Sequence, residues 1–295
     1  MDSRVTVEFR VPSAGLATYF STFYEMHITG DEPVLDCLPP EWANIQTGID
    51  NFFSLGPDPD SGLVPSPSQM VLRGPTKGPT WVSGLGRVFG LGILPIGWSR
   101  LWTHPCQPYA DRIVCLSEMV GVAAYQKFES DLRNAADFDD RISLAESWLT
   151  QQLAMTRPDR NQHLIDRLFA MLNDPEILEI DEIAESLGLS PSQFARMCKR
   201  AFGYPPKLLL RRQRWMRMLG EMHSRPYSEW RDFIDPHYVD QSHMLRDFRD
   251  FLGMSPSAYF ALSRPILNAT TRARAAAAGK PYQILHDPDA AKPGD

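Results

Sequence analysis

Two stretches of the C-terminal half repeat each other: Phe194-Ala-Arg-Met-Cys-Lys-Arg-Ala-Phe-Gly-Tyr-Pro-Pro206 and Met244-Leu-Arg-Asp-Phe-Arg-Asp-Phe-Leu-Gly-Met-Ser-Pro256. They align without gaps, each position matching the one 50 residues further on. Basic, glycine, proline and apolar positions all match in this register: Arg196 with Arg246, Lys199 with Arg249, Gly203 with Gly253, Pro206 with Pro256, Phe194 with Met244, Cys198 with Phe248 and Phe202 with Leu252. Matches of several kinds in one register indicate a duplicated structural unit.

Each copy has the order of a helix-turn-helix: a short helix, a turn and a capped second helix. In the first copy, Gly188 ends a short helix at 182–187. Ser190 can cap the next helix, with Pro191 at its first position and Gln193 at the capping-box position. The same signals predict helices at 191–202, 206–223, 227–234 and 240–252 and a short last helix from 256.

The apolar residues assign a buried face to each second helix, and the remaining residues point outward. These are the candidate DNA-binding residues: Ser192, Ala195, Arg196, Lys199, Arg200, Gln241, Ser242, Leu245, Arg246 and Arg249. Arg can donate twice to guanine, and Gln pairs similarly with adenine. Lys199 and Arg249 lie one turn later, where phosphates are in reach. The alternative is that these residues only solvate two helix faces.

The helix expected at 206–223 would set the distance between the two units. Its 18 residues span roughly 27 Å at 1.5 Å each. Successive major-groove turns lie ~34 Å apart on one face of DNA. Four arginines lie on this helix, of which some are expected to approach the DNA backbone and some to pair with acidic neighbours: Arg211, Arg212, Arg214 and Arg217.

Charge is distributed unevenly along the 295 residues, whose formal net charge is −6. Residues 190–218 contain eight basic side chains and no acidic one, so the remainder carries −6 − 8 = −14. Residues 1–150 contain 10 basic and 18 acidic side chains, a net −8. An acidic front half joined to a basic segment is expected of a regulated nucleic-acid binder. A solvated helical face is the alternative.

Residues 178–260 resemble the AraC-type family of bacterial transcription regulators. The resemblance rests on Ile183-Ala184 with Leu187-Gly-Leu-Ser190, on Phe202-Gly-Tyr-Pro-Pro206, on Tyr238-Val-Asp-Gln-Ser-His243, and on Phe248-Arg249 with Gly253-Met-Ser-Pro-Ser-Ala-Tyr259. It implies two helix-turn-helix units, a role in transcription control and a separate sensing domain.

Two positions depart from the family pattern. The second turn reads Asp235-Pro-His-Tyr238, where the family usually has Gly before the aromatic residue. His237 must then adopt a conformation that Gly takes freely, so the second unit is expected to be weaker or distorted. Cys198 replaces a bulky Phe in the first unit, and Ala195 can offer a base only methyl contact, which leaves polar readout to Ser192 and Arg196.

The front half is β-rich. Strands are expected at 4–9, 68–72, 88–94 and 111–116, between turns rich in Gly and Pro, with a short helix at 97–102. Residues 36–121 are similar to a β-rich N-terminal domain of some AraC-type regulators, through Leu38-Pro39, Gly74-Pro75, Arg87-Val-Phe-Gly90 and Pro95-Ile-Gly-Trp-Ser-Arg-Leu101. Six aromatic residues are candidates to line a pocket, although core positions are the simpler interpretation: Trp42, Phe52, Trp81, Trp98, Trp102 and Tyr109.

The predicted fold class is α+β, in four parts. Residues 1–121 form a β-rich domain expected to bind an effector or partner, and 122–175 form a helical bridge with helices at 122–133, 138–155 and 160–173. Residues 176–264 form an all-α domain with two helix-turn-helix units. Residues 265–295 have no apolar face and are expected to be a disordered tail.

Other chemistry finds little support in the sequence. The four cysteines form no CxxC pair and the seven histidines are scattered, so no metal site and no cofactor is expected. No nucleophile or phosphate-binding motif is present, which argues against an enzyme. The start lacks a signal-peptide pattern and no apolar run is long enough for a membrane span, so a cytoplasmic protein is expected.

The leading hypothesis is a sequence-specific regulator that reads the major groove of double-stranded DNA with helices 191–202 and 240–252. An N-terminal domain that binds a small-molecule effector or a partner would modulate it. RNA polymerase would be a partner if the protein is an activator, and a homodimer through 122–172 or the front domain fits the pattern. Two alternatives stay open: a protein-interaction module with degenerate helix-turn-helix units, and a β-barrel enzyme with a helical appendage.

Overall fold

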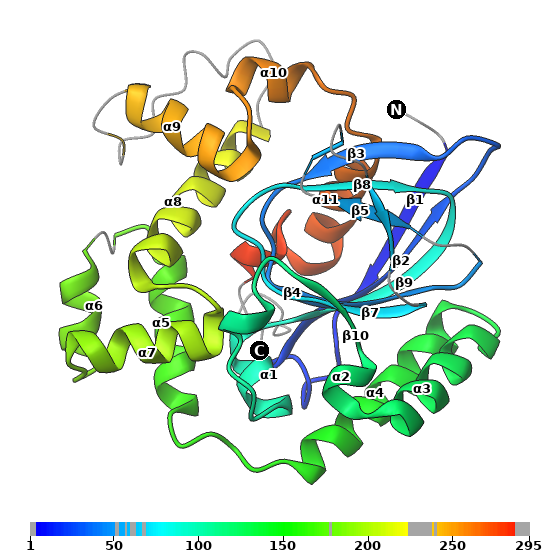
Figure 1. Ribbon diagram of the computed structural model, residues 1–295, viewed down its shortest axis with the longest axis horizontal. Helices are drawn as coiled ribbons and strands as arrows, with labels where there is room; N and C mark the ends of the chain where they lie inside the picture. Colours follow the sequence, from blue (N-terminus) through cyan, green and yellow to red (C-terminus); the bar gives the residue numbers. More distant parts are fainter. Residues whose placement is uncertain are drawn as a thin grey trace.

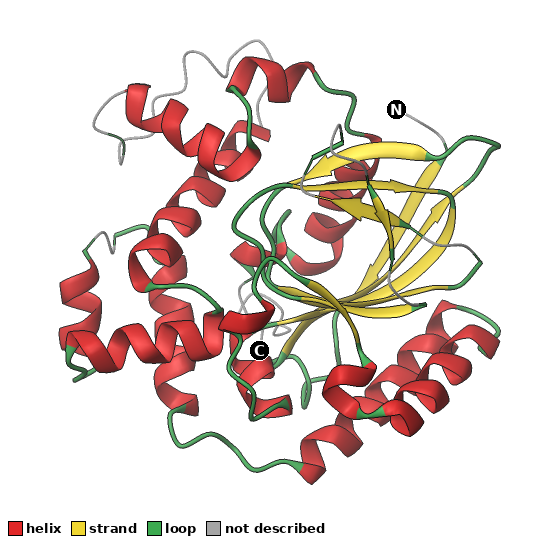
Figure 2. Cartoon of the chain, viewed as in Figure 1, coloured by secondary structure: helices red, strands yellow, loops and turns green. Residues whose placement is uncertain are grey.

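The front half of the chain folds into two antiparallel sheets (Figures 1 and 2). The computed structural model describes residues 4–50, 53–56, 58–59, 63–66, 69–176, 179–223, 238 and 241–286. The six-stranded sheet has the order β1-β2-β9-β4-β7-β10 and the four-stranded sheet the order β3-β8-β5-β6. The strands are β1 (Val5–Arg10), β2 (Phe20–Ile28), β3 (Val34–Leu38), β4 (Ala43–Gly48), β5 (Ser54–Gly56), β6 (Val64–Pro65), β7 (Met70–Arg73), β8 (Thr80–Gly84), β9 (Gly86–Ile93) and β10 (Ile113–Cys115).

The four strands expected from the sequence are present as β1, β7, β9 and β10, and the others were not predicted. β2 has its first four residues buried in succession, including Ser21 and Thr22, and its pairing with β9 shifts between Phe20 and Phe23. A bulge of this kind interrupts the two-residue alternation on which strand prediction depends.

Helices of the predicted bridge divide between two hydrophobic clusters. α3 (Val122–Asn134) and α4 (Phe138–Met155) pack with α1 (Pro95–Leu101) and α2 (Ser117–Val120) against the six-stranded sheet. Phe128 of α3 and Trp148 of α4 stack with ring centroids 4.2 Å apart. α5 (Gln162–Asn173) packs instead with the C-terminal helices, so the chain passes between the two halves in the segment 156–161.

The C-terminal helices form a second layer beside the sheets (Figure 1). They are α6 (Ile180–Ser186), α7 (Pro191–Phe202), α8 (Pro206–His223), α9 (Gln241–Leu252) and α10 (Pro256–Ala261). The predicted helices at 191–202 and 206–223 are confirmed at both ends. The helix expected at 227–234 and the turn at 235–237 lie outside the described residues.

The prediction of a disordered tail is wrong for residues 265–286. α11 (Pro265–Ala278) packs against β1 and β3, and a 3-10 turn follows at Gln283–Leu285. Its buried face is made of Ile266, Leu267, Arg274 and Ala278. Small residues and an arginine supply much of this face, so the sequence shows no apolar stripe although the helix is well packed.

The front-domain aromatic residues are mostly core. Trp42, Trp98 and Trp102 are buried, and the Trp98 and Trp102 rings lie 4.9 Å apart. Tyr109 packs on Trp98 at 5.5 Å, and Trp81 packs against the C-terminal cluster. Phe52 lies outside the described residues.

Asp36 of β3 gives the packing of α11 a pH dependence. Its carboxylate accepts hydrogen bonds from the backbone N–H groups of Leu267 (2.9 Å) and Cys37 (2.6 Å). Burial raises the pKa of Asp36 from 3.8 to about 6. A raised pKa means that the folded state holds the proton more tightly, so this stabilisation is complete below pH 3.8 and is lost as the pH rises through 6.

We therefore expect the wild type to lose about 1.4 kcal/mol of unfolding free energy per pH unit between pH 4 and 6 from this group. Asp36→Asn removes the titration, so its urea-unfolding free energy, measured at pH 4, 5, 6 and 7, should lack that slope. Asp50→Asn is the control: the hydrogen bond from Arg87 lowers the pKa of Asp50, so that substitution acts in the opposite sense. Equal pH slopes in the wild type and Asp36→Asn would rule out this role.

Candidate nucleic-acid interface

The first helix-turn-helix consists of α6, a turn at Gly188 and α7. Gly188 has a φ of +66°, the left-handed conformation that glycine takes without strain. Ser190 caps α7 and forms a capping box with Gln193. Phe194, Met197 and Cys198 are buried, which leaves the opposite side of α7 facing outward. Four predicted residues lie there: Ser192 and Arg196 are exposed, and Ala195 and Lys199 are half-buried.

The second unit repeats this arrangement in α9. Met244, Phe248 and Phe251 are buried, and the outward residues are those predicted: Gln241, Ser242, Arg246 and Arg249 are exposed and Leu245 is half-buried. Gly203 and Gly253, matched in the repeat, both adopt positive φ, at +85° and +70°. Within the described residues, the duplication seen in the sequence is present in the structure for α7 and α9 and for the glycine turn that follows each, with Arg196 and Arg246 exposed at equivalent places.

The connecting helix α8 holds the second unit through an aromatic cluster. Trp215 is fully buried, with its ring 5.6 Å from that of Phe248 and 5.1 Å from that of Phe251. Arg211 donates to Asp247 from Nε at 2.6 Å and to Asp250 from Nη2 at 2.5 Å. Asp247 is fully buried and also accepts from the Tyr238 hydroxyl at 2.8 Å. α9 is thus fixed to α8 by packing and by charge-assisted hydrogen bonds.

The arginines of α8 serve internal contacts rather than forming an exposed basic surface. Arg211 pairs with α9, and Arg217 donates to the Leu172 carbonyl at 2.8 Å. The Arg214 guanidinium lies 5.2 Å from the Tyr238 ring centroid. Arg212 is fully buried, and burial lowers its pKa to about 10. The predicted pairing with acidic neighbours is confirmed for Arg211, while Arg212, Arg214 and Arg217 contact carbonyl oxygens or aromatic rings.

Arg212 is part of a junction between α8 and the front sheets. Its guanidinium lies 4.1 Å from the Trp42 ring centroid and donates to the Thr76 carbonyl at 2.8 Å. The Tyr204 hydroxyl lies 2.6 Å from the Pro75 carbonyl oxygen and 2.9 Å from Asp111 Oδ1. Burial and the nearby carboxylate of Asp111 raise the pKa of Tyr204. The end of the first unit is therefore anchored to the front half.

Arg200 contacts the front half at this junction, although 48% of its side chain remains exposed. Its Nη2 donates to the Thr103 carbonyl at 3.0 Å, and its Nε lies 3.7 Å from Asp159 Oδ2. The Arg200 carbonyl accepts from the Cys106 N–H at 2.7 Å. In this arrangement Arg200 contacts the front half, although the sequence pattern grouped it with the DNA-binding residues.

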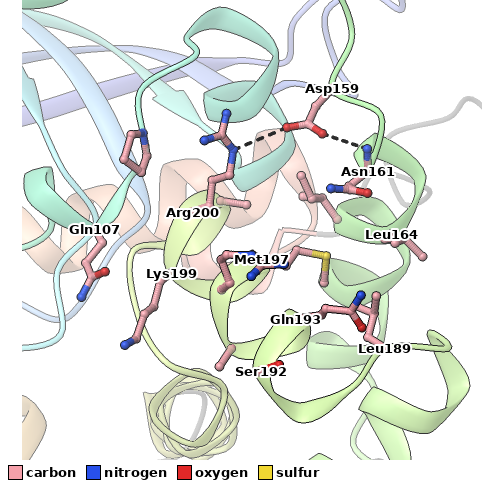
Figure 3. Close-up of a pocket in the computed structure, with 15 residues that line it drawn as sticks. Gln107, Asp159, Asn161, Leu164, Leu189, Ser192, Gln193, Met197, Lys199 and Arg200 are labelled. Carbon is pink, nitrogen blue, oxygen red and sulfur yellow. Dashed lines mark hydrogen bonds and ion pairs between the residues drawn. The ribbon is translucent and has the colours of Figure 1, made fainter.

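A cleft of about 860 Å³ runs along the flank of α7 (Figure 3). It is lined by Arg196, Lys199 and Arg200 of α7, by Gln107 of the front half, and by Asp159 and other residues from 159–165. Figure 3 shows Asp159 turned toward Arg200 on one side of the cleft, with Ser192 and Lys199 near its opposite end. The recognition face of the first unit is therefore bordered by other parts of the same chain.

Titratable groups elsewhere have structural surroundings. Burial raises the pKa of Cys37 and of Cys198 to about 12, which leaves both as thiols at neutral pH. Burial and the charge of Arg264 lower the pKa of His223 to about 3. Within the described residues there is no group of three or more His, Cys, Asp or Glu side chains that could hold a metal ion. No described helix is long and apolar enough to cross a membrane.

Comparison with known protein families gives one match. Residues 183–261 match the family model described as a helix-turn-helix domain, and this range contains both copies of the repeat. Residues 183–261 are a helix-turn-helix domain. Helix-turn-helix domains bind DNA through their second helix, which agrees with the prediction made from the repeat.

Comparisons of the whole chain are less specific. No curated protein matches. Among solved structures, this chain is similar to ToxT from Vibrio cholerae O395, at 11% identity over 87% of this chain and 96% of that chain, with a TM-score of 0.39. ToxT of the same strain bound to (E)-4-(8-methylnaphthalen-1-yl)but-3-enoic acid is 9% identical over 88% of this chain and 98% of that chain, with a TM-score of 0.42. ToxT of Vibrio cholerae strain SCE256 bound to an unsaturated fatty acid is 10% identical over 87% of this chain and 94% of that chain, with a TM-score of 0.41.

The sequence did not reveal how the helix-turn-helix domain contacts the front half. Tyr204 belongs to the Gly-Tyr-Pro-Pro stretch that ends the first unit, and Arg212 was grouped only with the other arginines of its helix. One local signal was available for Arg212. A basic side chain on the apolar side of an amphipathic helix is a candidate for a buried contact. Its partners, Trp42 and Thr76, are far away in the sequence.

Proposed function

We propose that this protein is a sequence-specific regulator of transcription that reads the major groove with α7 and α9. The observation that carries the proposal is the exposure of Arg196 and Arg246 at equivalent positions of two similarly built helices. Recognition helices read base edges with side chains near their start, and an arginine can donate twice to guanine. Lys199 and Arg249 are assigned to phosphates, and Ser192, Ala195, Gln241, Ser242 and Leu245 to the surrounding contacts.

The test begins with selection of bound duplexes from a random DNA library by the full-length protein. Enrichment of a motif with two half-sites supports reading by both helices. A single half-site would remove α9 and its outward residues from the proposal. If no sequence is enriched and the affinity for DNA does not change with salt, the alternative protein-interaction module is favoured. Phosphate contacts release counterions, so an affinity that depends on them must fall as salt is added.

Substitution of Arg196 separates base reading from simple charge. Arg196→Ala should weaken binding to the selected duplex by about 1–3 kcal/mol and relax the preference at one base pair. Lys199→Ala, the control, should weaken binding to selected and random duplexes alike and reduce the salt slope by about one. Both are measured by fluorescence anisotropy at several salt concentrations. Equal losses on both duplexes for Arg196→Ala would contradict its base-reading role.

We also propose that the front half modulates DNA binding by taking up a small-molecule effector or a partner. The support is a cavity between the six-stranded sheet and α11, where Glu41 and Arg73 are paired at 3.4 Å; its free volume is about 70 Å³, so an effector would have to displace part of α11 to enter. An effector can act only if it binds the DNA-competent and the DNA-incompetent states with different affinities. A ligand screen by thermal shift, followed by DNA titration with each hit, tests this part.

The partners of transcription complete the proposal. A homodimer through α3 and α4 or through the front sheets would place two AraC-type domains on one operator, and activation would require a contact with RNA polymerase. Sedimentation of the protein alone and on the selected duplex measures the first, and in-vitro transcription with purified polymerase measures the second. No catalytic role is assigned.

A further inference from the structure

The chain returns to its front half after the second helix-turn-helix unit. Residues 265–286 follow α10 and lie against strands from the first 50 residues (Figure 1). Ile266 and Leu267 are buried there, and the Leu267 N–H donates to Asp36 at 2.9 Å. A segment covalently attached to the DNA-binding domain is thus part of the core of the other domain.

The segment forms one side of a cavity whose other side is formed by the sheet. Arg274 is buried and its Nη1 donates to Thr22 Oγ1 at 2.5 Å. The space that remains is about 70 Å³, room for a few water molecules only. Within the described part of the chain, Arg274 Nε and Ser21 Oγ have no hydrogen-bond partner. α11 therefore occupies volume in the front half without satisfying all of its polar groups.

The sheet is shaped to accept the end of the segment. Gln283 Nε2 donates to the Ala43 carbonyl at 3.2 Å, and Asn44 Nδ2 donates to Gln283 Oε1 at 3.2 Å. A Cβ at Gly92 of β9 would lie 2.3 Å from Gln283 Nε2, so only glycine leaves room for this contact. The fit places residues 282–286 at a defined position on β4 and β9.

The opposite side of residues 282–286 contacts the helical layer. Gln213 of α8 donates to the Ile284 carbonyl at 2.7 Å, and Asn173 of α5 donates to the His286 carbonyl at 3.1 Å. Tyr282 is hydrogen-bonded to His223 at the end of α8. The segment therefore joins α8 to the front sheet, in addition to the Arg212 and Tyr204 contacts.

This join fixes the position of α7, which leads into α8 through Gly203 and Tyr204. Arg200 of α7 contacts Thr103 and Asp159, and the outward flank of α7 lines the cleft. A recognition helix must enter a groove roughly 12 Å wide, with phosphate walls on both sides. Those walls need the space beside α7 that residues 105–107 and 159–161 now border.

We propose that residues 265–286 are an intramolecular clasp that holds α7 and α8 against the front half and lowers the affinity for DNA. The inference rests on the proposed function, because its readout is DNA binding. The clasped arrangement and the duplex compete for the position of α7, so release of the clasp raises the affinity. Coupling of this kind typically corresponds to a change of about 5- to 150-fold in affinity.

The experiment uses the full chain with a specific-protease recognition sequence inserted between Leu262 and Ser263, where Ser263 is exposed. The uncut protein keeps the contacts of Arg264 with His223 and Tyr259, and removal of the fragment breaks these contacts together with those of α11. After cleavage the fragment that follows is removed by competition and gel filtration, and the affinity for the selected duplex is compared with that of the uncut protein. The expected result is an affinity about tenfold higher or more after removal.

A synthetic peptide of residues 265–286 added in trans should restore the lower affinity. The peptide with Arg274→Ala should be much less effective, because it loses the bond to Thr22. The matched control is the peptide with Arg272→Ala, which changes an exposed arginine of the same helix and should act as the wild-type peptide does. Equal DNA affinity before and after removal of the fragment would overturn the clasp, as would a peptide that raises the affinity.

Hydrogen exchange of the intact, uncleaved protein gives a second readout if the clipped form does not stay folded. Addition of the selected duplex should speed exchange of the backbone N–H groups of 265–278, and unchanged protection would overturn the clasp. If the uncut protein and the cleaved protein without the fragment bind the selected duplex with the same Kd, the result counts against the clasp alone. Failure of both forms to bind any selected duplex counts against the proposed function itself.

Discussion

Trp215→Ala is expected to lower the free energy of unfolding by about 3–5 kcal/mol. Its side chain is fully buried in α8 and contacts Phe248 and Phe251 of α9. Removal of the indole leaves a cavity at the point where the second helix-turn-helix packs on the connecting helix. Because the same contact fixes the position of α9, binding to the selected duplex should fall as well.

Urea unfolding followed by circular dichroism measures the first effect and anisotropy with the selected duplex the second. Trp215→Phe is the conservative variant and should recover most of both. Glu221→Ala, an exposed change near the end of the same helix, should leave both within about 0.5 kcal/mol of wild type. A loss of less than 1 kcal/mol for Trp215→Ala would show that the aromatic cluster does not hold the unit together.

The paired substitution Arg196→Ala with Arg246→Ala should remove about 2–6 kcal/mol of specific binding, the sum of two base-reading contacts. The two residues lie on separate helices, so their effects should add. Both are exposed, so the unfolding free energy should stay close to that of wild type. The protein would then keep most of its affinity for random DNA while losing its preference for the selected sequence.

The matched control is Lys199→Ala with Arg249→Ala, which removes the same number of charges from the phosphate-facing positions. That pair should weaken binding to every duplex and reduce the slope of log K against log salt by about two. Identical behaviour of the two double variants would mean that Arg196 and Arg246 act as charges and do not read bases.

The helical half was predictable because its signals are local. Ser190, Pro191 and Gln193 lie within four residues and define the start of α7, and Gly203 marks its end. The repeat then carried the same reasoning to α9, where four of the five predicted outward residues are exposed and Leu245 is half-buried.

The front half was less predictable because its strands do not alternate cleanly. β2 buries Ser21 and Thr22 among its first residues, so a polar residue there does not mark the solvent side. α11 was missed for a similar reason. Arg274 and small residues supply its buried face, so the segment has a composition that is typical of disordered tails. In both, distant partners reverse the usual meaning of a polar side chain, and those partners cannot be recognised from neighbouring positions.

The return of α11 to β1 also affects how the protein is made. β1 is the first described strand to leave the ribosome, and α11 is the last described α-helix. Until α11 emerges, Val5 and the other residues that it covers stay exposed to water, so the front half completes its core only late in translation. During that interval the unfinished sheet is the surface that a chaperone would recognise, while the helical domain is already able to fold.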